Sequence, residues 1–390
     1  MIYLDSAATS LHRPEEVTEA VCHALTHMGN SGRGGHETAL ETARIIYRAR
    51  KEIGAFFGQK DPSRVIFTAN VTQSLNMVIN GLFSAGDHVI TTCLDHNSVL
   101  RPLYRRQKEG VALTILPGDE KGHLRYEALS SALQPNTKAV ICTHASNLTG
   151  DLVDIDRIGQ FCRMNGLWFI VDCAQTAGIW PIDMEKQGID ILCFTGHKGL
   201  LGPQGTGGMC IREGISLKSF CVGGSGIQSY LKEQPEELPE HLEAGTLNGH
   251  GIAGLLAGVQ WLNKTGLDKI RLRELNLMRR FYKGIRDLPQ LKFYGDYEKE
   301  DRTAVVCLNV LEETEDRKGL SVVSSAEISD RLAQEYGIAV RGGAHCAPLM
   351  HETLGTKDTG AVRFSFSYFN TEEEIDQAIR AMREIAEDYR

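Results

Sequence analysis

Short apolar runs alternate with longer amphipathic stretches through the first half of the chain. The runs are rich in Val, Ile, Phe and Thr and end at polar or glycine-rich turns, which is typical of buried strands. They predict strands at 64–68, 87–92, 111–116, 139–143, 167–171, 189–194 and 209–211. The stretches between them repeat apolar residues every three or four positions and predict helices, among them 37–57, 75–83, 126–133 and 155–165. Strands alternating with helices indicate an α/β fold whose mostly parallel sheet is flanked by helices.

The pattern changes after residue 211. Residues 221–243 are glycine-rich and then acidic, and they predict an irregular excursion that is followed by helices at 251–262 and 267–285. Beyond residue 291 the pattern predicts a smaller α+β unit, with strands at 305–310, 338–340 and 362–368 and helices at 325–336 and 371–388. We therefore expect a large domain of residues 15–255 and a small domain built from residues 1–14 and 256–390.

Composition narrows the class of protein. The chain has 390 residues, of which 42% are hydrophobic, so it can bury a sizeable core. The net charge of −8 comes without any basic run, which argues against a nucleic-acid or membrane-surface partner. No secretory leader and no transmembrane run are expected from the pattern. The ten cysteines form no CxxC pair, which argues against a disulfide framework or a zinc site and favours a reduced, cytoplasmic compartment.

Polar side chains recur where the predicted strands end. In parallel sheets these carboxyl ends share one edge, and ligands bind there. The side chains that fall at or just beyond the strand ends are Thr72, His96, Asn147, Asp172, Gln175 and Lys198. Their recurrence predicts one polar site at that edge of the sheet.

Lys198 is the single lysine in a glycine-rich loop, residues 194–208, between two apolar runs. Glycine allows positive φ and close backbone approach, so the segment predicts a strand, a tight loop and a second strand. A lysine at the end of a buried strand is poorly solvated, its pKa falls, and it can form a Schiff base with a carbonyl. A surface lysine on a glycine-rich turn is an equally good interpretation of the loop alone.

If Lys198 binds pyridoxal phosphate, the strand-end residues include candidates to contact the ring nitrogen, the ring face and the ring hydroxyl. A buried carboxylate must keep the pyridine nitrogen protonated, and Asp172 ends a β-branched strand. A buried Asp requires a cationic partner, unless Asp172 is only a helix N-cap. His96 could stack on the ring, or be an ordinary loop histidine. Gln175 and Asn147 suit the ring hydroxyl.

Four further residues are candidates for binding a phosphate, for binding a substrate carboxylate or for acting as a nucleophile. Thr72 at a helix start and His197 suit a phosphate, although Thr72 could be a simple N-cap and His197 structural. Arg363 lies in an apolar strand and suits bidentate binding of a carboxylate, with a structural ion pair as the alternative. Cys346 follows a histidine on a glycine-bearing loop and is a candidate nucleophile, with a buried turn cysteine as the alternative.

Three spaced motifs resemble one known group of enzymes. Thr-Gly-His-Lys at 195–198, Val-Asp-Cys-Ala-Gln at 171–175 and Arg-Gly-Gly-Ala-His-Cys-Ala at 341–347 resemble the class V aminotransferase superfamily. Within it they are similar to the cysteine desulfurases and selenocysteine lyases, and the short cysteine loop resembles the group II type. The similarity runs nearly from end to end of the chain.

The resemblance implies a fold type I transferase that depends on pyridoxal 5'-phosphate and works as a homodimer with shared active sites. It implies conversion of L-cysteine to L-alanine, with a persulfide formed on Cys346 and passed to an acceptor protein, for instance for iron–sulfur cluster assembly. A selenocysteine lyase acting on L-selenocysteine is one alternative. Another class V enzyme, an aminotransferase or C–S β-lyase in which Cys346 is incidental, is a second.

The resemblance also assigns residues. Lys198 carries the Schiff base, Asp172 pairs with the pyridine nitrogen, His96 stacks, and Gln175 and Asn147 reach the ring oxygen. The residues implied to bind phosphate are Thr72, Thr195 and His197, with Thr246 from the partner subunit. Arg363 would hold the substrate carboxylate, with Arg33 and His36 at the mouth of the site.

The chain departs from the group II pattern at a few positions. Val71 stands where a second phosphate threonine is common, so one contact fewer is expected. Ala344 replaces a common histidine of the cysteine loop, which puts substrate preference and rate in question. Thr195 for serine and Cys173 for glycine are milder changes.

Overall fold

The computed structural model describes residues 1–30, 35–313 and 319–390. Its largest sheet has seven strands in the order β2-β8-β7-β6-β5-β3-β4. They are β2 (Val65–Thr68), β3 (His88–Thr92), β4 (Ala112–Leu116), β5 (Thr137–Thr143), β6 (Trp168–Asp172), β7 (Ile191–Thr195) and β8 (Gly207–Ile211). All neighbouring pairs are parallel except those of β8, which runs antiparallel to β7 and to β2. The carboxyl ends of β5, β6 and β7 therefore lie at one edge of the sheet.

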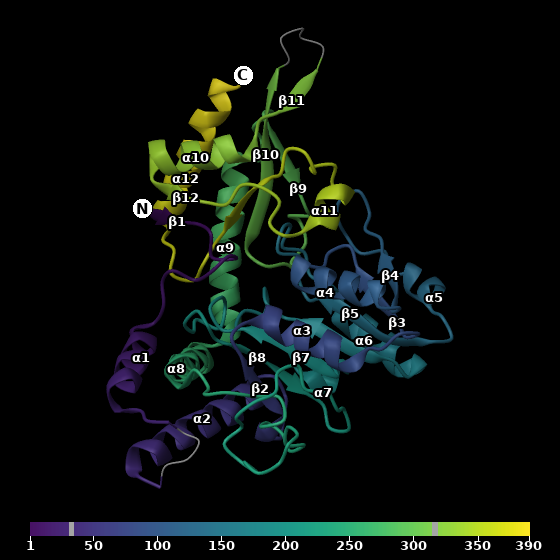
Figure 1. Cartoon of the computed structure of the whole chain (residues 1–390). Helices are drawn as coiled ribbons and strands as arrows, with labels where there is room; N and C mark the ends of the chain where they lie inside the picture. Colours follow the sequence, from purple (N-terminus) through teal and green to yellow (C-terminus); the bar gives the residue numbers. More distant parts are fainter. Residues whose placement is uncertain (31–34, 314–318) are drawn as a thin grey trace.

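Helices cover both faces of this sheet (Figure 1). One face packs against α3 (Val71–Leu82) and α4 (Asn97–Lys108), and strand residues such as Ile66 point toward them. The next residue, Phe67, points to the other face, which is covered mainly by α2, α6 and α8. This alternation follows from the two-residue period of a strand. The bounds of the covering and flanking helices are α1 (Glu15–His27), α2 (Glu37–Phe56), the 3-10 turn Pro62–Arg64, α5 (Ala128–Ala132), α6 (Ile155–Asn165), α7 (Met184–Gln187) and α8 (Gly249–Thr265).

The C-terminal part forms a second layer around a smaller antiparallel sheet. Its strands are β9 (Leu291–Tyr294), β10 (Val305–Glu313), β11 (Leu320–Val322) and β13 (Val362–Ser365), and β10 pairs with each of the other three. Its helices are α9 (Leu267–Ile285), α10 (Ser325–Tyr336), α11 (Pro348–Thr353) and α12 (Glu372–Asp388). A separate core that includes Phe281, Phe364 and Ile385 joins sheet and helices.

The N-terminal segment connects the two parts. Strand β1 (Ile2–Tyr3) pairs with β12 (Ile338–Ala339) in the C-terminal part, and the chain then runs down to α1 beside the large sheet (Figure 1). On the way, the Ser10 amide donates to His197 O at 2.9 Å, and the Arg13 side chain donates to Gly202 O. The segment therefore lies directly on the glycine-rich loop after β7.

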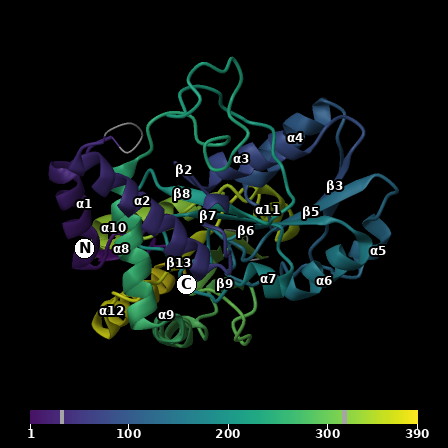
Figure 2. The same cartoon turned by 90° about the horizontal axis from the view of Figure 1, so that it is seen from below.

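The mostly parallel sheet flanked by helices, with a smaller α+β part, confirms the predicted architecture. Residues 212–248 contain no helix or strand and form the predicted excursion, seen as the projecting teal-green loops in Figure 2. The strand predicted at 362–368 ends at Ser365, because its pairing with β10 ends there. The predicted domain boundaries stay a prediction. No helix in the described part of the chain is both long and apolar enough to cross a membrane.

Candidate active site

A cavity of about 320 Å³ lies at the carboxyl ends of β5, β6 and β7. Most of the side chains predicted to form the site line this one cavity. They are Thr72, His96, Asn147, Asp172, Gln175, Thr195, His197, Lys198 and Arg363. Six of these residues were predicted to meet from the strand-end rule for parallel sheets, although they are spread over more than a hundred positions: Thr72, His96, Asn147, Asp172, Gln175 and Lys198.

Lys198 enters the cavity from the tight loop between β7 and β8. The loop needs its glycines, because a Cβ on Gly196 would lie 2.1 Å from Thr206 Oγ1 and one on Gly199 would lie 2.5 Å from Ala177 O. Ser10 Oγ donates to Lys198 O at 2.9 Å and fixes the backbone. Burial, helped by the Arg363 guanidinium, lowers the pKa of the Lys198 amine to about 8. The amine is therefore partly in its nucleophilic free-base form near neutral pH.

Asp172, the last residue of β6, is only 3% exposed. Its carboxylate accepts a hydrogen bond from the Ala174 amide at 2.9 Å, and burial raises its pKa. It starts no helix, so the N-cap interpretation is wrong. Within the described residues no cationic group lies within 4 Å of this carboxylate, so the cationic partner expected from the sequence does not come from there. The chain thus buries an anion that a bound cation would stabilise.

His96 and Thr72 meet through Ser98. His96 is the N-cap of α4, with Nδ1 accepting from the Ser98 amide at 3.0 Å. Burial and the Lys198 charge lower the pKa of His96 to about 4, so its ring is neutral near pH 7. The hydroxyls of Ser98 and Thr72 lie 2.7 Å apart. Thr72 is the second residue of α3, whose cap is Asn70, so the simple N-cap interpretation of Thr72 is wrong. This helix start opens on the cavity.

Several polar atoms in the cavity wall lack partners. Thr195 Oγ1 and Asn147 Oδ1 are buried without a hydrogen-bond partner among the described residues. Gln175 Nε2 donates to Ala7 O at 3.2 Å, and His197 Nδ1 lies 3.0 Å from Thr9 Oγ1. Burial lowers the pKa of His197 to about 4, so it too is neutral near pH 7. Unpaired buried polar atoms are costly, and their concentration here favours a polar ligand.

Arg363 on β13 reaches the cavity from the C-terminal part and is 1% exposed. Its Nη2 donates to Asp5 Oδ1 at 2.8 Å, and Nη1 donates to Asn147 O at 2.9 Å. The structural ion pair considered from the sequence therefore exists, and the side chain also lines the cavity. Its Nε is buried and has no hydrogen-bond partner among the described residues.

Cys346 follows a cavity-lining residue, His345, in the loop between β12 and α11. Both residues have positive φ, +50° and +55°, a conformation that non-glycine residues rarely adopt and that marks local strain. Two hydrogen bonds hold the loop: Asn147 Nδ2 donates to His345 O at 2.7 Å, and the Asn97 amide donates to Cys346 O at 2.8 Å. Cys346 is half-buried, which agrees better with an accessible thiol than with a buried turn cysteine.

Among the described residues, His36, Thr246 and Cys346 were predicted for the site but do not line this cavity. His36 is an exposed N-cap of α2, and Thr246 lines a different cavity together with Tyr47 and Arg50. Arg33 lies outside the described residues. Because Thr246 was expected to act from a partner subunit, its position outside the cavity of its own chain agrees with that expectation without testing it.

Other lining residues were not predicted. Asp5, the anionic partner of Arg363, and Asn70, Ser98 and Arg341, which line the cavity, were not among the predicted site residues. Ser98 belongs to the same strand-end segment as His96, and Arg341 opens the cysteine-loop motif, so a signal was present for both. Asp5 comes close only through the return of the N-terminal segment, which no local pattern shows.

Comparisons with known proteins fit this arrangement. Residues 2–378 match the model of the family described as aminotransferase class V. The chain belongs to this family. It is 32% identical to a probable cysteine desulfurase of Pyrococcus abyssi, over 100% of this chain and 95% of that protein. It is 30% identical to a probable cysteine desulfurase of Methanothermobacter thermautotrophicus, over 99% of this chain and 94% of that one.

Solved structures of two cysteine desulfurases share the fold over nearly the full length of this chain. The apo structure of a cysteine desulfurase from Thermococcus onnurineus NA1 superimposes with a TM-score of 0.90 and 32% identity, covering 99% of this chain and 95% of that one. A cysteine desulfurase from Escherichia coli gives a TM-score of 0.86 and 27% identity, covering 100% and 95%. The resemblance drawn from the three motifs is thereby confirmed.

Proposed function

We propose that the protein is a pyridoxal-phosphate-dependent cysteine desulfurase that converts L-cysteine to L-alanine and leaves the sulfur on Cys346. The observation that carries this proposal is one cavity in which Lys198 and Asp172 lie together, with the Cys346 loop held against its wall. Full-length similarity to proteins named cysteine desulfurase supports it.

The residues of the cavity fit the cofactor. A buried carboxylate with no ion-pair partner within 4 Å among the described residues suits a protonated pyridine nitrogen, and the unpartnered Thr195 Oγ1, in the cavity on which α3 begins, suits a phosphate. Lys198 would attach the cofactor, and His96 would stack on it. Gln175 and Asn147 would reach the ring oxygen, and Thr72, Thr195 and His197 the phosphate. When bound, pyridoxal phosphate supplies an electron sink that stabilises negative charge at the substrate α-carbon.

Binding and proton transfer fall to two residues of this chain. Arg363, which lines the cavity, holds the substrate carboxylate, while Asp5 and Asn147 O fix the position of its guanidinium. Lys198 Nζ removes the α-proton, since a lysine amine with a pKa of about 8 is a competent base near neutral pH.

The sulfur step falls to Cys346. Its thiolate attacks the sulfur of the bound cysteine, so that an S–S bond forms while the Cβ–S bond breaks. The electron pair of that bond stays with Cβ, which takes up a proton as L-alanine forms. Cysteine and the Cys346 thiol thus give alanine and a Cys346 persulfide without any external oxidant. The persulfide then passes its outer sulfur to a thiol of an acceptor protein.

A homodimer with shared sites belongs to the same proposal. Thr246 and His36 lie outside the cavity of their own chain, so a second copy would have to bring them to it. Thr246 would then bind the phosphate of the partner's site, with His36 and Arg33 at its mouth.

The experiment that tests the proposal compares wild type with Cys346→Ala on L-cysteine and on L-selenocysteine, in the presence of dithiothreitol. We expect equal amounts of alanine and sulfide from L-cysteine, abolished in Cys346→Ala although the variant retains its cofactor. Alanine formed from L-selenocysteine alone, and unaffected by Cys346→Ala, would replace the proposal with a selenocysteine lyase. Amino transfer to a keto acid, independent of Cys346, would replace it with an aminotransferase.

A further inference from the structure

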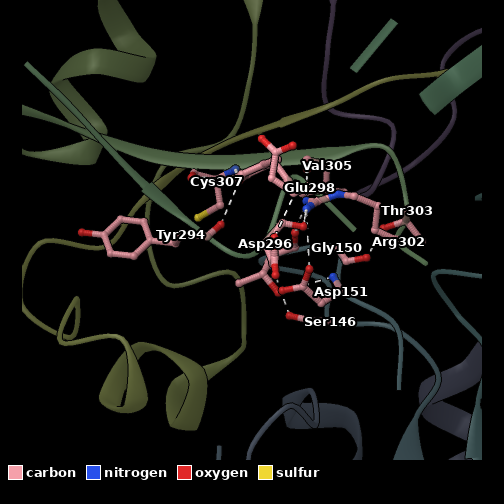
Figure 3. A network of polar contacts seen from close by, with 12 residues as sticks. Ser146, Gly150, Asp151, Tyr294, Asp296, Glu298, Arg302, Thr303, Val305 and Cys307 are labelled. Atoms are coloured by element: carbon pink, nitrogen blue, oxygen red, sulfur yellow. Dashed lines mark hydrogen bonds and ion pairs between the residues drawn. The ribbon is translucent and has the colours of Figure 1, made fainter. Parts of the chain in front are cut away.

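Asn147 belongs to a tight turn, residues 146–151, that lies between the cavity and the C-terminal part. The turn closes on itself, with the Ser146 amide donating to Asp151 O and the Gly150 amide donating to Ser146 O, both at 3.0 Å. Asn147 lines the cavity, whereas Asp151, at the other end of the turn, does not line it and lies beside Arg302 (Figure 3). The two ends of one short turn thus face two different surroundings.

Arg302 is fully buried and contacts the end of this turn that includes Thr149 and Asp151 (Figure 3). Its Nη2 donates to Thr149 O at 2.8 Å and to Val305 O at 2.9 Å, and Nη1 donates to Asp296 O. The guanidinium lies 3.6 Å from Asp151 Oδ1 and 4.1 Å from the centre of the Tyr297 ring. One planar group therefore fixes the turn to both sides of the β9–β10 connection.

The inner end of the turn holds two functional elements. Asn147 O accepts from Arg363 Nη1, and Asn147 Nδ2 donates to the carbonyl of His345, next to Cys346. Arg363 lies opposite Cys307 where β13 pairs with β10. Arg302 donates a hydrogen bond to Val305 O, in the same strand β10. A shift of the turn against β10 would therefore change both the Asn147–Arg363 bond and the Asn147–His345 bond.

Stability alone explains this network poorly. Burying a guanidinium and a carboxylate carries a large desolvation penalty, and apolar residues of similar volume often replace such a pair without loss of stability. Both Asp151 carboxylate oxygens lack a hydrogen-bond partner within the described residues, so the pair is not optimised for binding energy. What the fork of Arg302 adds is a fixed geometry between three carbonyls.

We infer that Arg302 and Asp151 are positioning residues that, through Asn147, set the substrate-carboxylate residue Arg363 and the cysteine loop in register with each other. They touch neither substrate nor cofactor. The role in catalysis rests on the proposed desulfurase function, whereas the role in holding the cysteine loop stands on the contacts alone.

The test uses Arg302→Lys in the purified holoenzyme. Lysine keeps the charge beside Asp151 but cannot bond three carbonyls at once. The rate at which iodoacetamide alkylates Cys346 is measured by peptide mass spectrometry, relative to the exposed Cys22 and Cys221 of the same molecules. We expect an increase of about fivefold, the factor that corresponds to one lost hydrogen bond of ordinary net strength. The KM for L-cysteine should rise about tenfold and kcat should fall less, as expected for loss of a substrate-binding residue.

Arg50→Lys is the matched control. Arg50 is also buried, pairs with Glu243 and Val65 O, and lies 4.8 Å from the Phe67 ring, but it has no contact with the 146–151 turn. It should lower the thermal midpoint by a similar amount and leave the alkylation ratio of Cys346 unchanged. Equal increases in both variants, or no increase in Arg302→Lys, would overturn the inference.

Two further variants keep the test decisive. Asp151→Asn takes the place of Arg302→Lys if that variant does not fold. It preserves the side-chain volume and should raise the alkylation rate of Cys346 by a smaller factor. Asn147→Ala should raise the alkylation rate of Cys346 while the Arg302 contacts stay intact. The double variant Asn147→Ala/Arg302→Lys should show no further increase, because both substitutions act on the His345 carbonyl. Fully additive effects would show that Arg302 acts elsewhere. Alkylation needs no turnover, so a wild-type protein that makes no alanine would refute the proposed function while this comparison still decides the inference.

Discussion

Burial shifts the pKa values of Lys198 and Glu274 in opposite directions. Lys198, in the cavity wall, has a pKa lowered to about 8, and Glu274 on α9, which is 7% exposed, has a pKa raised to about 8. In both cases the buried environment disfavours the charged form. For Lys198 the outcome is a reactive amine beside Asp172. Glu274 becomes a neutral acid whose Oε1 accepts from the Tyr368 amide at 3.0 Å.

Replacing Lys198 tests the reactive amine directly. Lys198→Ala should abolish turnover completely and also the attachment of pyridoxal phosphate through a protein nitrogen. Borohydride reduction of the wild type, followed by peptide mass spectrometry, should place the reduced cofactor on Lys198, and the variant should carry none. Lys198→Arg keeps the charge and is expected to behave like the alanine variant. A reduced adduct on another lysine would refute the assignment.

Glu274 should make stability depend on pH. Its folded pKa of about 8 exceeds the ordinary 4.5, so the folded state binds more protons than the unfolded state between these values. The contribution of Glu274 is therefore fully present below about pH 4.5 and is lost as the pH rises toward 8, at up to about 1.4 kcal/mol per unit. Glu274→Gln should remove this slope. Urea unfolding at pH 5.5, 6.5 and 7.5 measures it, and identical slopes in the two proteins would contradict the prediction.

Among the elements, α12 has the clearest local start signal. Thr371 Oγ1 accepts from the Glu374 amide, and the Glu374 side chain accepts from the Thr371 amide, which is a complete capping box. Thr371→Ala should lower the free energy of unfolding by about 1 kcal/mol, and Thr371→Ser should restore most of it. Neither variant should change the kcat for L-cysteine, since Thr371 does not line the cavity. Denaturant titration beside an alanine assay checks both points.

Elements with strong local signals are the ones that the sequence predicts well. The helices expected at 155–165, 267–285 and 325–336 have these bounds in the structure. The first and third combine helical periodicity with a glycine stop, Gly166 and Gly337, whereas α9 ends without one and follows its periodicity alone. The helix expected at 75–83 begins earlier, at Val71, because the Asn70 side chain accepts from the Gln73 amide and caps the helix there. Strand β11 and helix α11 are short and depend on tertiary contacts, so periodicity alone could not reveal them.

The residues of the site also differ in how well the sequence predicts them. Residues after parallel strands were predictable, because topology alone brings strand ends together. Asp5 was not, because its ion pair with Arg363 joins positions 358 residues apart and leaves no local pattern. The cluster around Arg302 is equally long-range, since it joins residues 149–151 to 296–305.

At the scale of the whole molecule, the position of Thr246 bears on assembly. Thr246 lines a cavity of about 690 Å³ with Tyr47, away from the cavity of Lys198. Exposed apolar side chains occur on α2 and in the irregular segment, with Tyr47 60% and Val222 73% exposed. Exposed apolar groups near Thr246, which lies outside the cavity of Lys198, favour a second copy covering this face.

Light scattering after size exclusion should therefore give about twice the 43.1 kDa of one chain. Tyr47→Glu places a charge in the expected interface and should shift the protein toward monomer. It should also speed loss of pyridoxal phosphate about tenfold, because Thr246 of the second copy would no longer reach the phosphate. Met164→Glu is the matched control, since Met164 is 86% exposed at the end of α6 and should stay dimeric. A wild-type monomer with full activity would show instead that each chain completes its own site and that Thr246 binds no phosphate.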